Sequence, residues 1–186
     1  MDFLNNTLYR EDVDSSCKNI QEIQKLSGET EAEIHKIMIM GGSRIAIRIS
    51  SYAPDNMAIK LIECDKQKSY KLAEYMNDII IIQGDGRNVD LLKEEGIRDM
   101  DAFIALTDSS ETNILACLTA KELGVKKTIA EVENIQFIST AERLNIGNII
   151  NKKLLAASRI FQLLLDEDSS NAKCLALSDA EVVELV

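Results

Sequence analysis

The sequence lacks tryptophan, contains one proline and one histidine, and has only 4% aromatic residues in a chain of 186 residues. It has no apolar run of the roughly 18–20 residues that a membrane-spanning helix requires. It also has no basic segment followed by an apolar segment, which is the pattern of a secretory signal peptide. From these absences we expect a protein of the cytoplasm.

Metal-binding and redox motifs are absent as well, because the four cysteines form no Cys-x-x-Cys pair. We expect small, buried hydrophobic side chains at all four positions, which are Cys17, Cys64, Cys117 and Cys174. Basic residues are in deficit, since 31 acidic residues face 21 basic ones and the formal net charge is −10. A nucleic acid requires a basic surface to balance its phosphates, so we expect no nucleic-acid partner.

The sequence does contain a regular alternation of short apolar runs and amphipathic runs. Continuous apolar runs are typical of strands buried on both faces of a parallel sheet, and they lie at 36–40, 58–62, 79–82, 101–106, 128–132 and 148–150. The amphipathic runs predict helices at 43–52, 66–76, 88–95, 108–123, 135–144 and 152–165. The fourth helix opens with a capping-box pattern at Asp108–Glu111. Because crossovers between parallel strands are right-handed, we predict an α/β fold with a doubly wound, Rossmann-like parallel sheet in the strand order 3-2-1-4-5-6.

The segments on either side of this alternation differ in character. Residues 1–35 are polar and acidic, whereas residues 166–186 contain two strand-like pieces, at 171–177 and 180–186, and end within an apolar run. We therefore predict three parts: an acidic segment at 1–35, the Rossmann-like domain with its terminal helix at 36–165, and the start of a truncated further domain at 166–186.

The turn after the first predicted strand carries the main functional motif. Gly41-Gly-Ser-Arg-Ile-Ala46 reads as G-x-S-x-x-A beside the dinucleotide-binding fingerprint G-x-G-x-x-G/A. In that pattern Gly41 permits the tight turn, and the free N–H groups at the start of the next helix attract a phosphate. Ser43 departs from the pattern, although Gly42 restores backbone access, the serine hydroxyl is a donor, and Arg44 adds positive charge. The alternative interpretation is an ordinary strand–helix turn.

An acidic residue follows at the spacing that the fingerprint predicts. Glu63 ends the second predicted strand 22 positions after Gly41, near the spacing of about 20 for the acid that binds ribose hydroxyls. Its carboxylate repels a 2′-phosphate, so we predict NAD(H) or another adenine nucleotide, rather than NADP, as the ligand. Asp85, after the third strand, is expected to accept a hydrogen bond from the adenosine. Alternatively, Glu63 is only a solvent-facing acid at the end of its strand.

Other strand ends complete a rim around the same site, because the carboxyl ends of parallel strands share one edge of the sheet. The fourth strand is followed by a hydroxyl cluster that includes Thr107, the fifth by Glu131, and the sixth by Asn151 and Lys152. Each of these residues alone is explained as well by a turn or a helix cap. Together they are consistent with one ligand site.

No catalytic group accompanies this site in the sequence. The only histidine, His35, precedes the first predicted strand and is expected at the far edge of the sheet. There is no Tyr-x-x-x-Lys pair, nucleophile elbow or Walker A motif, and so no visible general acid or base. We therefore predict a binding module and not an enzyme. The alternatives are a fragment of an NAD-dependent oxidoreductase and a nucleotide-free scaffold.

Beyond the glycine turn, the chain resembles the nucleotide-binding N-lobe of RCK/KTN proteins of the TrkA type. The resemblance extends over residues 36–160, and it is carried by Leu61–Asp65, Gly84–Gly86, Leu91–Gly96, Asp101–Thr107, Asn113 and Ala120–Gly124. Residues 178–185 are similar to the start of the C-lobe in that family. The resemblance implies a second N-lobe with the start of its C-lobe, preceded at 1–35 by a connector from an earlier half.

The resemblance also implies a function. Members of this family bind NAD(H) or another adenine nucleotide, assemble as dimers or tetrameric rings, and dock from the cytoplasm on a membrane potassium transporter whose ion flux they control. The terminal helix at 152–165 would then cross between subunits, although its apolar residues are equally explained as cover for its own core. Carried onto this sequence, the family's site implies that the phosphates are held by Gly41, Gly42, Ser43 and Arg44, the ribose by Glu63, the adenine by Asp85, and the distal half by Thr107.

Overall fold

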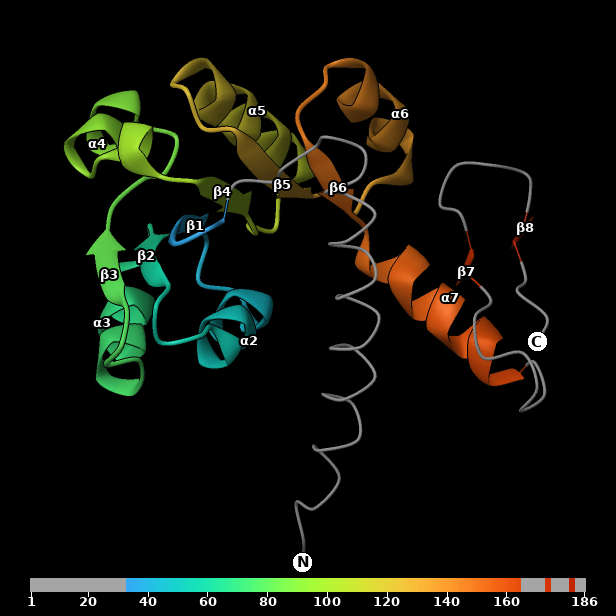
Figure 1. Ribbon diagram of the computed structural model, residues 1–186, viewed down its shortest axis with the longest axis horizontal. Coiled ribbons are helices and arrows are strands. Elements are labelled where there is room, and N and C mark those ends of the chain that lie inside the picture. The colour runs from blue at the N-terminus through green and yellow to red at the C-terminus, as the bar shows by residue number, and fades with distance from the viewer. Residues whose placement is uncertain (1–32, 165–172, 175–180, 183–186) are drawn as a thin grey trace, which may run out of the picture. The chain divides into compact units, whose positions relative to one another are not determined.

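The computed structural model describes residues 33–164, 173–174 and 181–182, and strands and helices alternate through the first of these ranges (Figure 1). The strands are β1 (Lys36–Met40), β2 (Ala58–Glu63), β3 (Ile80–Gln83), β4 (Ala102–Ala105), β5 (Lys127–Glu131) and β6 (Asn148–Ile150). The helices are α2 (Arg44–Tyr52), α3 (Lys66–Tyr75), α4 (Val89–Glu94), η1 (Ile97–Asp99), α5 (Ser110–Glu122), α6 (Ile135–Arg143) and α7 (Lys152–Leu164).

The six strands form one parallel sheet in the order β3-β2-β1-β4-β5-β6, which confirms the predicted fold class and topology. Met40 at the end of β1 lies opposite Ile62 of β2 and Ala105 of β4. The chain therefore leaves these three strands at about the same level. The strand order reverses between β1 and β4, which is where sheets of this kind bind ligands.

Helices cover both faces of this sheet, which explains why its strands are continuously apolar. Helices α4, α5 and α6 lie on one face, and α2 and α3 lie on the other (Figure 1). Met38 and Phe103 are buried against the first group of helices, whereas Ile39 and Leu61 are buried on the opposite face with α2 and α3. Side chains in a strand alternate between faces, so neighbouring residues of β1 enter different cores.

The predicted helices and strands in this range agree with the structure to within two residues, and most helices start at a polar cap. The capping box predicted at Asp108–Glu111 is wrong by one position, because the N-cap of α5 is Ser109, whose Oγ accepts a hydrogen bond from the N–H of Thr112 at 3.1 Å. The two predicted tail strands are represented by β7 (Lys173–Cys174) and β8 (Glu181–Val182), which pair antiparallel. The predicted segment at 1–35 lies almost wholly outside the described residues, and the three-part division stays a prediction.

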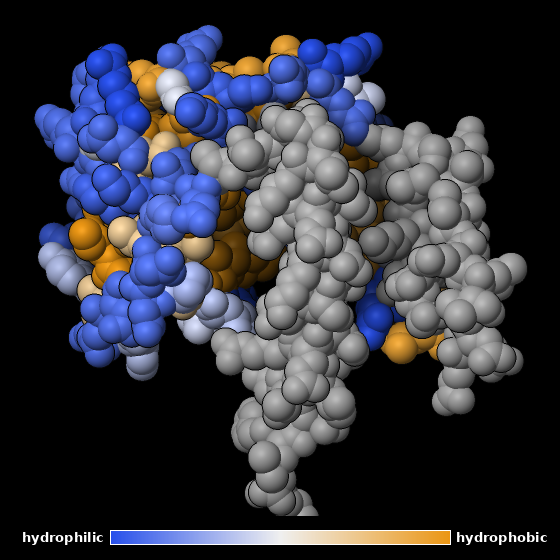
Figure 2. Space-filling model, viewed as in Figure 1, coloured by the Kyte–Doolittle hydropathy of each residue, from blue (hydrophilic) through white to orange (hydrophobic). Residues whose placement is uncertain are grey.

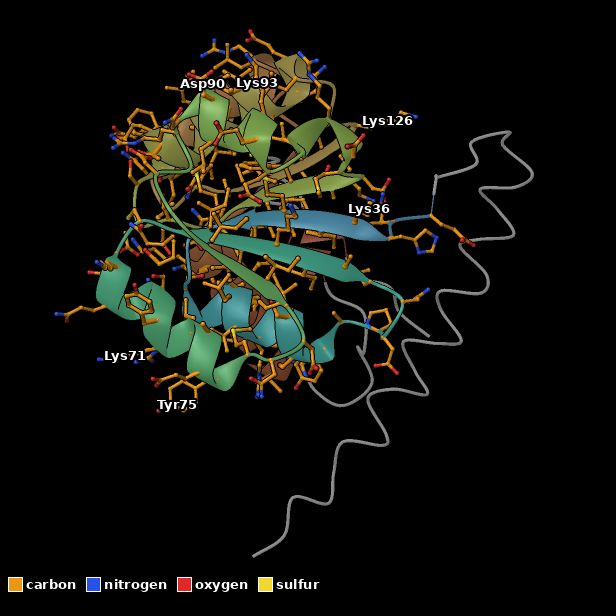
Figure 3. The ribbon with its side chains drawn as sticks, turned by 90° about the vertical axis from the view of Figure 1, so that its left-hand side faces the viewer. Lys36, Lys71, Tyr75, Asp90, Lys93 and Lys126 are labelled. Atoms are coloured by element: carbon orange, nitrogen blue, oxygen red, sulfur yellow. The ribbon has the colours of Figure 1, made fainter. Side chains whose placement is uncertain are left out.

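Side-chain positions distinguish the two edges of the sheet. Lys36 opens β1 and Lys126 precedes β5, and both lie at the same edge in Figure 3, so the carboxyl ends of the strands lie at the opposite edge. The same view shows Asp90 and Lys93 of α4 on one side of the sheet and Lys71 and Tyr75 of α3 on the other.

Figure 2 shows hydrophilic side chains over α4, α5 and α6 and an apolar area toward the middle of the view. No helix in the described ranges is long and apolar enough to cross a membrane.

Candidate functional site

A cleft of about 320 Å³ opens at the carboxyl edge of the sheet, among the residues that follow β1, β2, β3 and β4. Parallel strands bring these four loops together although they are far apart in the sequence. Six of the seven residues predicted for the site line this one cleft: Gly41, Gly42, Ser43, Glu63, Asp85 and Thr107.

The glycine turn after β1 has no space for side chains. Gly41 has a φ of +97°, and a Cβ added there would lie 2.9 Å from the carbonyl oxygen of Leu106. A Cβ added to Gly42 would lie 2.8 Å from Glu63 Oε2 and would also overlap the side chain of Leu72. The turn therefore brings bare backbone to the wall of the cleft, as a phosphate-binding turn requires.

Ser43, where the fingerprint has glycine, is the N-cap of α2. Its Oγ accepts a hydrogen bond from the N–H of Ala46 at 3.3 Å. The hydroxyl hydrogen is not used by that bond and remains a donor at the cleft wall. The first N–H groups of an α-helix have no partner within the helix, so the start of α2 attracts an anion.

Arg44 is the predicted site residue that the structure does not bring to the cleft. It is exposed at the first position of α2 and lines a separate, mainly apolar hollow of about 780 Å³ together with Arg48 and Tyr52. Residues four positions apart share one face of a helix, so Arg44 lies beside Arg48 on the outer face of α2. In the structure the Arg44 side chain thus lines that hollow and not the cleft, and its role in holding the phosphates stays a prediction.

Glu63 at the end of β2 is buried, with only 4% of the residue exposed, so the alternative of a solvent-facing acid is wrong. Its Oε2 accepts a hydrogen bond from the N–H of Gly42 at 2.9 Å and lies 2.8 Å from Lys68 Nζ. Its Oε1 accepts a hydrogen bond from the N–H of Asp65 at 3.0 Å. Burial alone would raise the pKa of Glu63, but the Lys68 ammonium and these two N–H groups lower it to about 2. Glu63 is therefore an ionised acceptor at neutral pH.

Lys68 is a residue of the site that sequence reasoning missed. It lies in the first turn of α3, where its backbone N–H is capped by Asp65 Oδ1 at 2.8 Å and its side chain returns to Glu63. It also lines the cleft and supplies positive charge there. Its position in the first turn of a helix that follows an acidic strand end could have indicated this role from the sequence.

The loop after β3 places a second ion pair at the cleft. Arg87 Nη2 lies 2.7 Å from Asp85 Oδ2, and Arg87 Nε lies 3.0 Å from Asp85 Oδ1. The Arg87 side chain, together with the backbone N–H of the same residue, holds the pKa of Asp85 below its usual value. Both side chains are exposed and line the cleft, so this loop offers an adjacent donor and acceptor to a ligand.

Thr107 at the far wall of the cleft is tied to Asn113 of α5, which is fully buried. The Thr107 hydroxyl donates to Asn113 Oδ1 at 2.6 Å, and the Thr107 N–H donates to the same oxygen at 3.0 Å. Asn113 Nδ2 donates in turn to the carbonyl oxygens of Thr107 at 2.9 Å and Glu131 at 2.8 Å. The amide of Asn113 therefore fixes the loop after β4 to the end of β5.

The cysteine prediction is confirmed at one position and wrong at another. Cys117 is buried in the core, whereas Cys64 is exposed and lines the cleft beside Glu63. Burial raises the pKa of the Cys64 thiol, and its contact with the Glu63 carboxylate, at 3.5 Å from Oε1, raises it further. Cys17 and the side chain of Cys174 lie outside the described residues.

The rim predicted at β5 and β6 does not belong to this cleft. Among the described residues that line it, none follows β5 or β6. Glu131 is buried instead, and its Oε1 lies 2.5 Å from Lys152 Nζ. Asn151 is also buried, and its Nδ2 donates to the carbonyl oxygen of Val132 at 2.7 Å. These polar groups are therefore engaged by the fold itself.

A comparison with known sequences relates the chain to potassium uptake proteins. Residues 37–152 match the model of the TrkA-N domain. The chain is 31% identical over 167 residues to the Trk system potassium uptake protein TrkA of Vibrio alginolyticus, with 90% of this chain and 36% of that protein aligned. It is 25% identical over 169 residues to Trk system potassium uptake protein trkA homolog 1 of Methanosarcina mazei, with 90% of this chain and 42% of that protein aligned. The chain thus spans about two fifths of the length of these relatives.

A comparison with solved structures supports the same fold. The structure named as GsuK bound to ADP superposes with a TM-score of 0.61 at 16% identity, over 74% of this chain and 36% of that chain. The GsuK channel bound to NAD superposes with a TM-score of 0.56 at 17% identity, over 75% of this chain and 24% of that chain. At these sequence identities the structural similarity shows the fold alone, whereas the match to the TrkA-N model shows the family.

Proposed function

Since residues 37–152 match its model, this chain belongs to the TrkA-N domain family, and from that premise we propose that it is a regulatory module that binds an adenine nucleotide in the cleft and thereby controls potassium transport. NAD(H) is the member of that ligand class that the sequence predicts. Binding without turnover is part of the proposal. The resemblance to RCK/KTN proteins, on which the sequence interpretation relied, is confirmed at the level of the family.

One contact carries the ligand proposal, namely the hydrogen bond from the N–H of Gly42 to Glu63 Oε2. It joins the glycine turn, which suits a phosphate, to the carboxylate that suits ribose hydroxyls. The spacing of these two features along the chain is that of the dinucleotide-binding fingerprint. Asp85 and Arg87 lie on the third strand end, where an adenine would be held between polar groups. These contacts support the adenosine diphosphate portion that ADP and NAD(H) share.

The transport role is proposed from the relatives, whose names assign them to potassium uptake systems. In this proposal the module acts in the cytoplasm, as part of a homo-oligomer, on a membrane potassium transporter. The nucleotide controls flux only if it binds one arrangement of the assembly more tightly than another, because a ligand with equal affinity for both shifts nothing.

Two other functions make different predictions. An NAD-dependent oxidoreductase requires a general acid or base at the nicotinamide and a substrate pocket. It would oxidise or reduce the coenzyme in the presence of a substrate. A nucleotide-free scaffold would bind no nucleotide at any concentration that is reached in a cell.

Isothermal titration calorimetry on the full chain tests the binding proposal with ADP, AMP, NAD+ and NADH. At least one of these is expected to bind, and Glu63→Gln is expected to weaken it roughly tenfold or more, because a hydrogen bond to a charged group contributes about 1.5–3 kcal/mol. Glu74→Gln, an exposed carboxylate on α3, is the matched control. Absence of binding by all four nucleotides, or unchanged binding in Glu63→Gln, would contradict the proposal.

A further inference from the structure

The topology divides a dinucleotide site into two halves. In doubly wound sheets of this strand order, one mononucleotide is bound by β1, β2 and β3 and the other by β4, β5 and β6. The cleft of this chain opens at the ends of β1 to β4, and no described residue that lines it comes from the end of β5 or β6. Its volume of about 320 Å³ is near the lower limit of ordinary ligand pockets, which is roughly 300 Å³.

An ion pair occupies the place where the second half would begin. Glu131, the last residue of β5, is 2% exposed, and Lys152, the first residue of α7, lies 2.5 Å from its Oε1. Asn113, which is bonded to Thr107 at the cleft wall, also donates to the carbonyl oxygen of Glu131. The end of β5, which carries this pair, is therefore tied to the far wall of the cleft through Asn113.

Several other polar groups at this edge are also bonded within the fold. The N–H groups of Glu133 and Asn134 donate to Ser110 Oγ at 3.0 and 3.3 Å. Asn151 Nδ2 donates to the carbonyl oxygens of Val132 and Glu133, at 2.7 and 3.2 Å. A second sugar and phosphate would find few free donors or acceptors there. The first half, in contrast, keeps the helix N-terminus of α2 and the hydroxyl of Ser43 available.

Glu131 Oε2 is the exception, because it is buried and has no hydrogen-bond partner among the described residues. Buried polar atoms are nearly always paired, so Oε2 is an acceptor that the described residues leave open. Lys152 Nζ lies on the neighbouring oxygen, Oε1, so a ligand that approached the carboxylate from that side would have to move the Lys152 side chain away. That movement would separate a buried carboxylate from the one cation that lies within 4 Å of it among the described residues, which is strongly unfavourable.

We propose that this cleft selects an adenosine mononucleotide over a dinucleotide, and that Lys152, held on Glu131, is the residue that determines this specificity. The inference rests on the proposed function and narrows it to ligands that end at or shortly after the second phosphate. Lys152 closes the second half by its position and does not contact the adenosine portion. Its effect therefore appears only with ligands that carry a second ribose.

Calorimetry on the full chain with ADP, ADP-ribose and NAD+ tests this inference, because the three ligands share one portion and differ only beyond the second phosphate. We expect NAD+ to bind at least tenfold more weakly than ADP, with ADP-ribose between them. The double variant Glu131→Ala/Lys152→Ala removes both partners, so no unpaired charge is left buried, and it is expected to reduce the difference severalfold. Lys153→Ala is the control, because Lys153 is 71% exposed and, among the described residues, its ion pair is with Glu133, at 3.5 Å.

The comparison of ligands on the unaltered chain decides the inference, whether or not the double variant folds. NAD+ binding as tightly as ADP would overturn it and leave the proposed function standing. Failure of ADP and NAD+ alike would contradict the proposed function itself. A folded double variant that keeps the full preference for ADP would remove Lys152 as the determinant.

Discussion

Glu63 Oε2 accepts the backbone N–H of Gly42 at 2.9 Å, so the carboxylate at the end of β2 is bonded directly to the glycine turn at the end of β1. The same oxygen also lies 2.8 Å from Lys68 Nζ. One side chain thus links β1, β2 and the first turn of α3. The contact has consequences both for stability and for ligand binding.

We expect Glu63 to make stability dependent on pH. Its pKa is lowered from 4.5 to about 2 in the folded chain, so its contribution is present above the unfolded value and is lost as the pH falls toward 2. Urea unfolding should show Glu63→Gln destabilised by about 1–3 kcal/mol at neutral pH, a range that allows for the partial exposure of Lys68. At about pH 3, the free energies of unfolding of Glu63→Gln and of the unaltered chain should differ by less. A difference that is constant between these pH values would show that the ionised state is not what stabilises the fold.

Gly42→Ala should abolish ADP binding and destabilise the chain. The added Cβ would lie 2.8 Å from Glu63 Oε2 and would overlap Leu72 Cδ1, so the carboxylate and the end of the Leu72 side chain must both move. Overpacking of this kind costs about 1–3 kcal/mol, measurable by urea unfolding. Gly84→Ala is the control for the effect of overpacking on stability, because its Cβ would meet the Leu91 side chain, at 2.6 Å from Cδ2, and no carboxylate. ADP affinity that survives in Gly42→Ala would show that the turn does not hold the phosphates.

The sequence predicts those features of the fold and the site that depend on residues close together along the chain. The strands and their order follow from runs such as 36–40, because a strand buried on both faces must be apolar at every position, as Met38 and Ile39 are. Gly41, Gly42 and Glu63 are predictable because the fingerprint fixes their spacing along the chain. The helix start at Ser109 was misplaced by one residue, since Asp108 and Ser109 are both good caps.

The contacts that sequence reasoning missed depend on tertiary structure. The direction of Arg44 is set by the rotation of α2, which brings it beside Arg48 on the outer face and not to the cleft. Glu131 and Lys152 are 21 positions apart and meet only because β6 places the start of α7 against the end of β5. No local sequence pattern encodes this ion pair, and both residues were therefore predicted to lie on the rim of the ligand site.

Cys64 should report on occupancy of the cleft. It is exposed and lines the cleft, whereas Cys117 is buried, so an alkylating reagent should modify the first and spare the second. Saturating ADP should slow alkylation of Cys64 severalfold, as followed by mass spectrometry of the peptide that contains it. Because the pKa of the Cys64 thiol is raised, alkylation should also accelerate as the pH increases beyond the usual range of thiols. Equal rates with and without ADP would place the nucleotide elsewhere.

The exposed apolar side chains of α7 should hold copies of the chain together. Leu155, Ile160 and Leu163 are 60%, 59% and 71% exposed, while Leu154 packs against the core of the domain. Ile160→Glu should therefore lower the mass measured by light scattering, because a buried carboxylate would oppose association. Tyr75→Glu on α3, where the tyrosine is 82% exposed, controls for a charge placed on an unrelated surface. An unchanged mass in Ile160→Glu would favour a helix that serves only its own domain.

Asn113→Asp should destabilise the chain strongly, although it exchanges a single atom group. The amide nitrogen of the buried Asn113 donates to the carbonyl oxygens of Thr107 and Glu131, and a carboxylate would leave both without that donor. The expected loss is about 2–4 kcal/mol in urea unfolding at neutral pH. Asn134→Asp is the matched control, because Asn134 is the exposed N-cap of α6 and aspartate caps a helix equally well.

Burial raises the pKa of an introduced aspartate, so the loss of stability in Asn113→Asp should shrink at acidic pH, where the neutral acid can again donate one hydrogen bond. If the two variants were equally stable at neutral pH, the bonds of Asn113 would not be what fixes the loop after β4 to the end of β5.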